Sequence, residues 1–190
     1  MKVSNTAYIL TSVVIIGSMI ACQPGKKDMN KESSVEIAKE ANDSIFTDRN
    51  EEKDADFIVN AIAANYAEIK MAQLARNKSV DDRVKEIASK IETDHTKVSN
   101  ELKAYADLKG IPVPLEESPG DSKELSDLDK QGVDKFDNDW YKAMESRHRK
   151  SISKFEARLK RTEDPDLRAL IYSTLPAFNS HLKMFEDHGK

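Results

Sequence analysis

The feature that most constrains the fold is a spacing of three and four positions between apolar residues, which recurs in four segments of this 190-residue chain. Such spacing places apolar side chains on one face of a helix, and that face must pack against other helices. A content of 34% charged residues with six glycines also suits helices. We therefore predict an all-α four-helix bundle over residues 54–188, with helices at about 54–77, 80–109, 133–161 and 165–188.

A long connection separates the second segment from the third. Gly110, Pro112 and Pro114 end the second helix, and the third begins near Val133. One short helix is expected within the connection, around residues 123–130. A dozen extended residues span about 40 Å, so the connection permits a crossover along the whole length of the bundle.

The N-terminal segment is typical of a secretory signal peptide. Lys2 precedes an apolar run from Ala7 to Ile20, which is shorter than the roughly 20 apolar residues of a membrane-spanning helix. The run ends in Met-Ile-Ala-Cys, which resembles the bacterial lipobox. We therefore expect residues 1–21 to be removed and Cys22 to carry a lipid that anchors the protein to a membrane. An ordinary signal peptide and an uncleaved anchor are the alternatives.

Residues 22–53 contain mostly Lys, Asp, Glu, Asn and Ser. Such a segment buries too little apolar surface to offset the entropy lost on ordering, so we predict a flexible tether in which residues 35–45 form at most a frayed helix. Gln23 after the cysteine is compatible with delivery to the outer membrane. The expected location is the cell envelope, at the outer membrane and facing the periplasm.

Composition excludes several classes of function. The net charge of -4 gives no basic surface for nucleic acid. A single cysteine allows neither an intramolecular disulfide nor a thiolate zinc site. No serine or cysteine lies in a recognisable nucleophile motif, so a hydrolase has no support.

Each helical segment carries one polar residue on or beside its apolar stripe: Glu68, His95, His148 and His181. A single histidine in such a position is typical of a hydrogen-bonded core residue. Four groups on four helices favour a shared role, because unpaired burial costs about 1 to 3 kcal/mol each and coordination of a cation removes much of that cost. The pattern predicts a transition-metal site, and a metal-free core of hydrogen-bonded histidines is the alternative.

The expected helix starts place the three histidines at similar depth and Glu68 one or two turns away from them. Three imidazoles with one carboxylate suit zinc, copper, nickel or a single iron. Asp94 precedes His95 but points about 100° away from it, as an acceptor that orients a ligand or as a salt-bridge partner.

Two Glu-x-x-His steps, at Glu92 and Glu145, are like those of di-iron bundle proteins. The fourth helix offers no glutamate at the level of His181, which disfavours a di-iron centre. Metal-dependent redox catalysis would need an open coordination position, which a sequence does not show.

The chain resembles the bacterial "domain of unknown function 4142" family of exported proteins, which are often described as predicted outer membrane proteins. The resemblance covers residues 54–188 and lies in these residues: Glu68, Asp94-His95-Thr96, Leu102, Phe136-Asp137, Tyr141, His148, Phe155-Glu156, Leu175-Pro176 and His181-Leu182. It implies a ferritin-like topology with a crossover between helices two and three. It assigns no activity. The expected function is metal binding by an envelope lipoprotein, for sensing, storage or scavenging, and the alternative is a non-catalytic structural or interaction lipoprotein.

Overall fold

The computed structural model describes residues 32–188, and its regular secondary structure is entirely α-helical. The all-α prediction is confirmed. No helix in this part of the chain has the length and apolar character needed to cross a membrane. Residues 32–188 form these helices: α1 (Ser34–Ile45), α2 (Arg49–Lys78), α3 (Asp82–Lys109), α4 (Pro119–Asp129), α5 (Val133–Leu159) and α6 (Pro165–His188).

The structure differs from the expected tether in residues 34–53. Ser33 begins α1 with a capping box, and Val35 and Ala38 are buried where α1 packs against α2. Asp48 then caps α2, which begins before the expected boundary at Asp54. This polar segment is therefore helical and packed where the sequence predicts a tether. The expected signal peptide and Cys22 lie outside the described residues.

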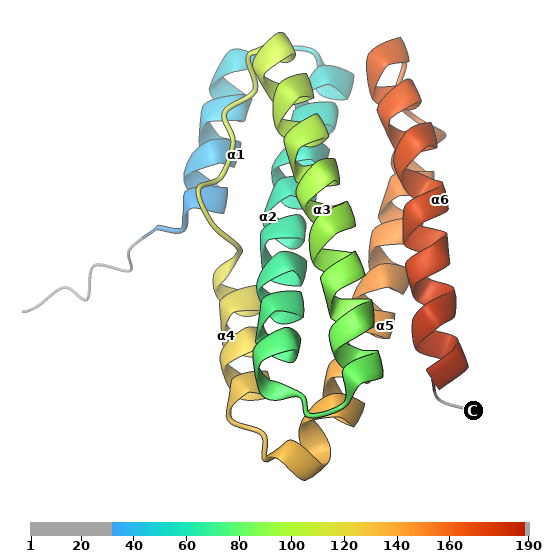
Figure 1. Cartoon of the computed structure of the whole chain (residues 1–190). Helices are drawn as coiled ribbons and strands as arrows, with labels where there is room; N and C mark the ends of the chain where they lie inside the picture. Colours follow the sequence, from blue (N-terminus) through green and yellow to red (C-terminus); the bar gives the residue numbers. More distant parts are fainter. Residues whose placement is uncertain (1–31, 189–190) are drawn as a thin grey trace, which may run out of the picture. The chain divides into compact units, whose positions relative to one another are not determined.

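The four long helices form two antiparallel hairpins, α2 with α3 and α5 with α6. Additional contacts join α2 to α5 and α3 to α6, so each long helix touches two others. Figure 1 shows α3 and α5 running in the same direction. After α3 the chain runs back toward the end of the domain where α3 begins and forms α4, and α5 starts from that end. Gly110 turns the chain out of α3 with φ of 68°, a backbone conformation that suits glycine.

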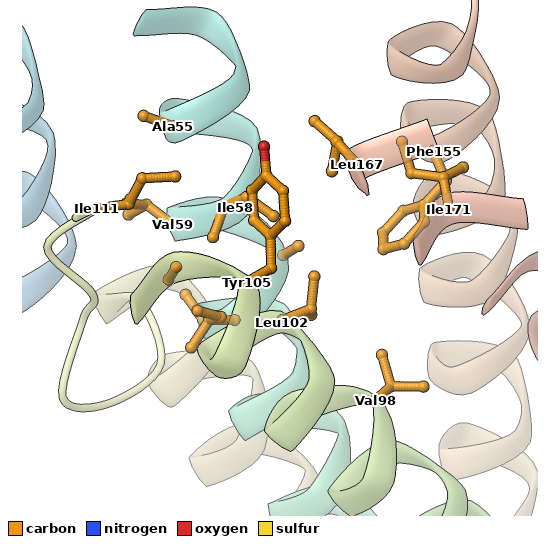
Figure 2. Packing of buried hydrophobic residues seen from close by; sticks show 14 of the residues in the cluster. Ala55, Ile58, Val59, Val98, Leu102, Tyr105, Ile111, Phe155, Leu167 and Ile171 are labelled. Carbon is orange, nitrogen blue, oxygen red and sulfur yellow. The ribbon is translucent and has the colours of Figure 1, made fainter. Parts of the chain in front are cut away.

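A polar layer divides the hydrophobic core into two clusters. Figure 2 shows part of the first cluster, including Ile58 from α2, Leu102 from α3 and Phe155 from α5. The second cluster contains Met71, Trp140 and other apolar side chains beyond the layer. On α2, α3, α5 and α6 alike, the polar residues predicted from the sequence fall between the residues of the two clusters.

Candidate metal centre

The structure brings the four predicted polar residues together in the middle of the core. Glu68 lies on α2, His95 on α3, His148 on α5 and His181 on α6. All four are buried, with at most 2% of their surface exposed. One nitrogen from each histidine lies within 4.8 Å of the corresponding nitrogen of the other two. This is a geometry that can hold a metal ion.

The outward nitrogen of each imidazole contacts an oxygen. His95 Nδ1 lies 3.0 Å from Asn65 Oδ1, and the amide nitrogen of Asn65 donates to the Ala61 carbonyl at 2.8 Å, which fixes the amide orientation. His148 Nδ1 lies 2.9 Å from the carbonyl oxygen of Met144. Both oxygens can only accept a hydrogen bond here, so each requires a proton on the Nδ1 atom that it contacts.

The outward nitrogen of the third imidazole also contacts an acceptor. His181 Nε2 lies 2.8 Å from Asp94 Oδ2, which also accepts from Lys90 Nζ at 2.9 Å. Burial alone would raise the pKa of Asp94, but the hydrogen bonds from Lys90 and His181 lower it below its usual value. The carboxylate therefore stays ionised and holds the proton on Nε2, leaving Nδ1 with its lone pair.

The inward nitrogens consequently face each other without a proton between them. His148 Nε2 lies 3.2 Å from His95 Nε2 and 3.3 Å from His181 Nδ1. A neutral imidazole carries one proton, and each of these protons is already directed outward. Three lone pairs at such distances repel one another, and a cation between them converts that repulsion into attraction.

The surroundings of His95 and His181 oppose protonation of these two imidazoles. Burial lowers the pKa of His95 well below its ordinary value, and the neighbouring His148 and His181 add to this effect. Burial also lowers the pKa of His181 to about 4, against the opposing influence of Asp94. Phe178 stacks on His95 with a centroid distance of 5.1 Å, and Phe185 meets His148 edge-on at 5.0 Å. These rings make the immediate surroundings of the His95 and His148 imidazoles apolar.

Glu68 is the acidic residue beside the three histidines. Its Oε2 lies 3.3 Å from His95 Nδ1 and 3.8 Å from His148 Nε2. Its Oε1 lies 3.7 Å from Arg147 Nε and 3.5 Å from Ser151 Oγ. Arg147 is itself held by Asp121 and Glu124, each at 2.7 Å, from α4. The short helix of the connection thereby fixes a cation beside the site.

Comparison with known proteins identifies the family. Residues 39–187 match the family described as "Domain of unknown function (DUF4142)". The chain belongs to this family. The fold is also similar to a solved structure described as "Crystal structure of DUF305 fragment from Deinococcus radiodurans", with a TM-score of 0.63 and 14% identity over 70% of this chain and 93% of that one. At this identity the likeness concerns the fold alone. No curated protein matches the chain.

The DUF4142 domain places the glutamates of the two Glu-x-x-His steps away from the histidines. Glu92 pairs with Arg76, and Glu145 pairs with Arg149, both at the helix surface. Asp94 lies against His181 rather than beside its sequence neighbour.

Sequence reasoning missed Asn65 and Arg147. Asn65 lies three positions before Glu68, so the two share a helical face, and this spacing was the available signal. Arg147 gave no such signal, because its acidic partners come from α4.

Proposed function

We propose that this DUF4142 domain binds one transition-metal ion through His95 Nε2, His148 Nε2 and His181 Nδ1. The observation that carries the proposal is the direction of the three imidazoles: their outward nitrogens contact acceptors and their inward nitrogens converge. Histidines that bind metals typically donate their other N–H to such an acceptor. A core of histidines that merely satisfied one another would direct at least one N–H inward.

The distances favour a small ion with nitrogen bonds of ordinary zinc-site length. In a tetrahedral site with metal–nitrogen bonds of about 2.0 to 2.1 Å, two ligand nitrogens are about 3.3 Å apart. The two inward distances around His148, 3.2 and 3.3 Å, agree with that value, and the ligand nitrogens of all three histidines lie within 4.8 Å of one another. Imidazole ligands suit zinc, copper, nickel and iron, and disfavour magnesium and calcium.

The proposal places this site in an exported lipoprotein with a ferritin-like bundle. Two antiparallel hairpins joined by a long connection, with α3 and α5 in the same direction, support the ferritin-like assignment. The apolar run before Cys22 supports export and lipid anchoring. Metabolic labelling with a radioactive fatty acid tests the anchor: the label is expected on the wild type and absent from Cys22→Ser, and an unlabelled wild type would refute it.

Metal content of the purified protein tests the site. We expect one equivalent of zinc or another transition metal by elemental analysis after a mild chelator has removed loosely bound ions. The variant His148→Ala is expected to lose it. A wild-type protein without metal that also takes up none on addition of zinc, copper, nickel or iron would refute the proposal, and it would leave the histidines as structural core residues.

A further inference from the structure

A cavity between α2 and α5 reaches Asn65 and Glu68 at the edge of the polar layer, and none of the three histidines lines it. Its volume is about 40 Å³, and it is lined at the outer end by Asn60, Ala64 and Lys154 and at the inner end by Asn65, Glu68 and Ser151. Lys154 is exposed, whereas Asn65 and Glu68 are almost completely buried. A volume of this size holds a molecule of roughly two or three heavy atoms.

Glu68 carries a polar atom without a hydrogen bond at the inner end of this cavity. Glu68 is 2% exposed, and its buried Oε2 has no hydrogen-bond partner among residues 32–188. A buried carboxylate oxygen in this condition needs a donor, and its cost is about 1 to 3 kcal/mol without one. His95 Nδ1 lies 3.3 Å away, but its proton is directed toward Asn65.

The position of Glu68 differs from that of the three inward nitrogens. Glu68 Oε2 lies 3.3 Å from the outward Nδ1 of His95 and 3.8 Å from the inward Nε2 of His148. The group of ligand atoms that all lie within 4.8 Å of one another contains the three histidines and not Glu68. The carboxylate is also held from behind by Arg147 and Ser151. Glu68 thus lies beside the centre, toward the cavity, rather than as a fourth member of the set.

We infer that the metal leaves its fourth position to a small protic ligand, water or a molecule of similar size bearing O–H or N–H, which enters between α2 and α5. Glu68 Oε2 accepts the hydrogen bond of that ligand, and three histidines alone hold the ion. This inference rests on the proposed metal site and adds a fourth coordination position that a ligand from solvent can occupy. An open position is what separates a reactive metal centre from a closed structural one.

Cobalt(II) substitution tests whether the fourth position is open, with azide as the probe. Azide is an anion without a proton, so it replaces the protic ligand on the metal and does not itself donate to Glu68. The metal-free protein is loaded with cobalt(II), and azide is titrated while the visible absorption bands are recorded. We expect azide to shift the bands in a saturable manner. The variant Glu68→Gln, which is nearly isosteric and removes a negative charge beside the azide, should retain one equivalent of cobalt(II) and bind azide about tenfold more tightly, equal to about 1.4 kcal/mol.

A matched pair of alanine variants tests the route. Ala64→Leu narrows the cavity between α2 and α5 and should weaken or slow azide binding. Ala177 is half-buried and lines the groove between α3 and α6 beside Asp94. The variant Ala177→Leu should leave azide binding unchanged. Equal effects of the two variants would overturn the route, and circular dichroism verifies that each variant is folded.

The outcomes separate this inference from the proposed function. Cobalt(II) bands that azide does not change, or a Glu68→Gln variant that loses cobalt(II), would show a site closed by Glu68, so the open position would be refuted while the metal site stands. A wild-type protein that binds no cobalt(II) and none of the other transition metals would refute both.

Discussion

His95 Nε2 and His148 Nε2 lie 3.2 Å apart although each imidazole has an acceptor on its opposite side, Asn65 Oδ1 for the former and the Met144 carbonyl for the latter. Two acceptors facing each other at hydrogen-bond distance are unfavourable in a buried, low-dielectric core. The arrangement is favourable once a cation lies between the nitrogens, so the metal-free and metal-bound proteins should differ in stability, affinity and pH response.

The substitution Asn65→Ala should weaken metal binding without abolishing it. The change removes the acceptor that holds the proton on His95 Nδ1, and loss of such a partner costs about 10- to 100-fold in metal affinity. Competition with a chromogenic zinc chelator measures the effect. Asn60→Ala is the control, because its amide donates to the Asp56 carbonyl within its own helix; an equal loss in both variants would contradict the assigned role of Asn65.

Zinc should raise the melting temperature of the metal-free protein. Free zinc at 100 times Kd stabilises the folded state by about 2.7 kcal/mol, or roughly 5 to 10 °C for a domain of this size. His148→Leu keeps the bulk of the side chain but removes the central nitrogen, so its melting temperature should not respond to zinc. Phe155→Leu, a core change on the same helix, should melt earlier and still respond; a zinc response retained by His148→Leu would count against the site.

Acidification should destabilise the metal-free protein between about pH 6.5 and pH 4. An unfolded histidine titrates near 6.5, whereas burial lowers the pKa of His181 to about 4 in the folded protein. Within that window the unfolded chain binds more protons than the folded protein. The contribution of neutral His181 to the free energy of unfolding is therefore fully present above pH 6.5 and is lost as the pH falls toward the pKa of the folded state. Urea unfolding at several pH values measures it. His181→Asn should make the profile less steep, with the lowered pKa of His95 supplying the slope that remains. A wild-type profile that is flat across this window would contradict neutral burial of the histidines.

The substitution Ala38→Asp should destabilise the domain even though the segment is polar in sequence. Ala38 is 3% exposed where α1 packs on α2, and burying a carboxylate there without a partner costs about 1 to 3 kcal/mol or detaches the helix. Ile37→Asp is the control, because Ile37 is 54% exposed and should change stability by less than about 0.5 kcal/mol. Equal effects in urea unfolding would show that α1 does not contribute to the fold.

The periodicity of apolar residues was sufficient to predict the four long helices and to place the three histidines on their buried faces. Their apolar stripes extend over more than six turns, so errors of a few residues at the ends did not alter which face is buried. The stripe of α1 is too short to give the same signal. Its order depends on contacts with α2, which no local pattern reveals.

The position of Glu68 shows that counting residues along a helix locates the backbone but not the end of a long side chain. Asn65 lies 13 residues before the end of α2 at Lys78, and His95 lies 13 residues after the start of α3 at Asp82, so these two are level. Glu68 lies 10 residues before that end, nearly one turn away. Its longer side chain spans the offset and reaches His95 Nδ1 at 3.3 Å. The expected offset was therefore real in the backbone but absent at the carboxylate.

The polar layer between the two hydrophobic clusters also determines how the helices align along their axes. Sliding one long helix by a single turn, about 5.4 Å, would carry its histidine or glutamate into an apolar cluster and put an apolar side chain among the remaining polar groups. Leucine at all four positions would tolerate several such alignments, as uniformly apolar helical cores do. The layer therefore selects a single register for the bundle, and a chain that lost it would gain alternative packings before it lost its helices.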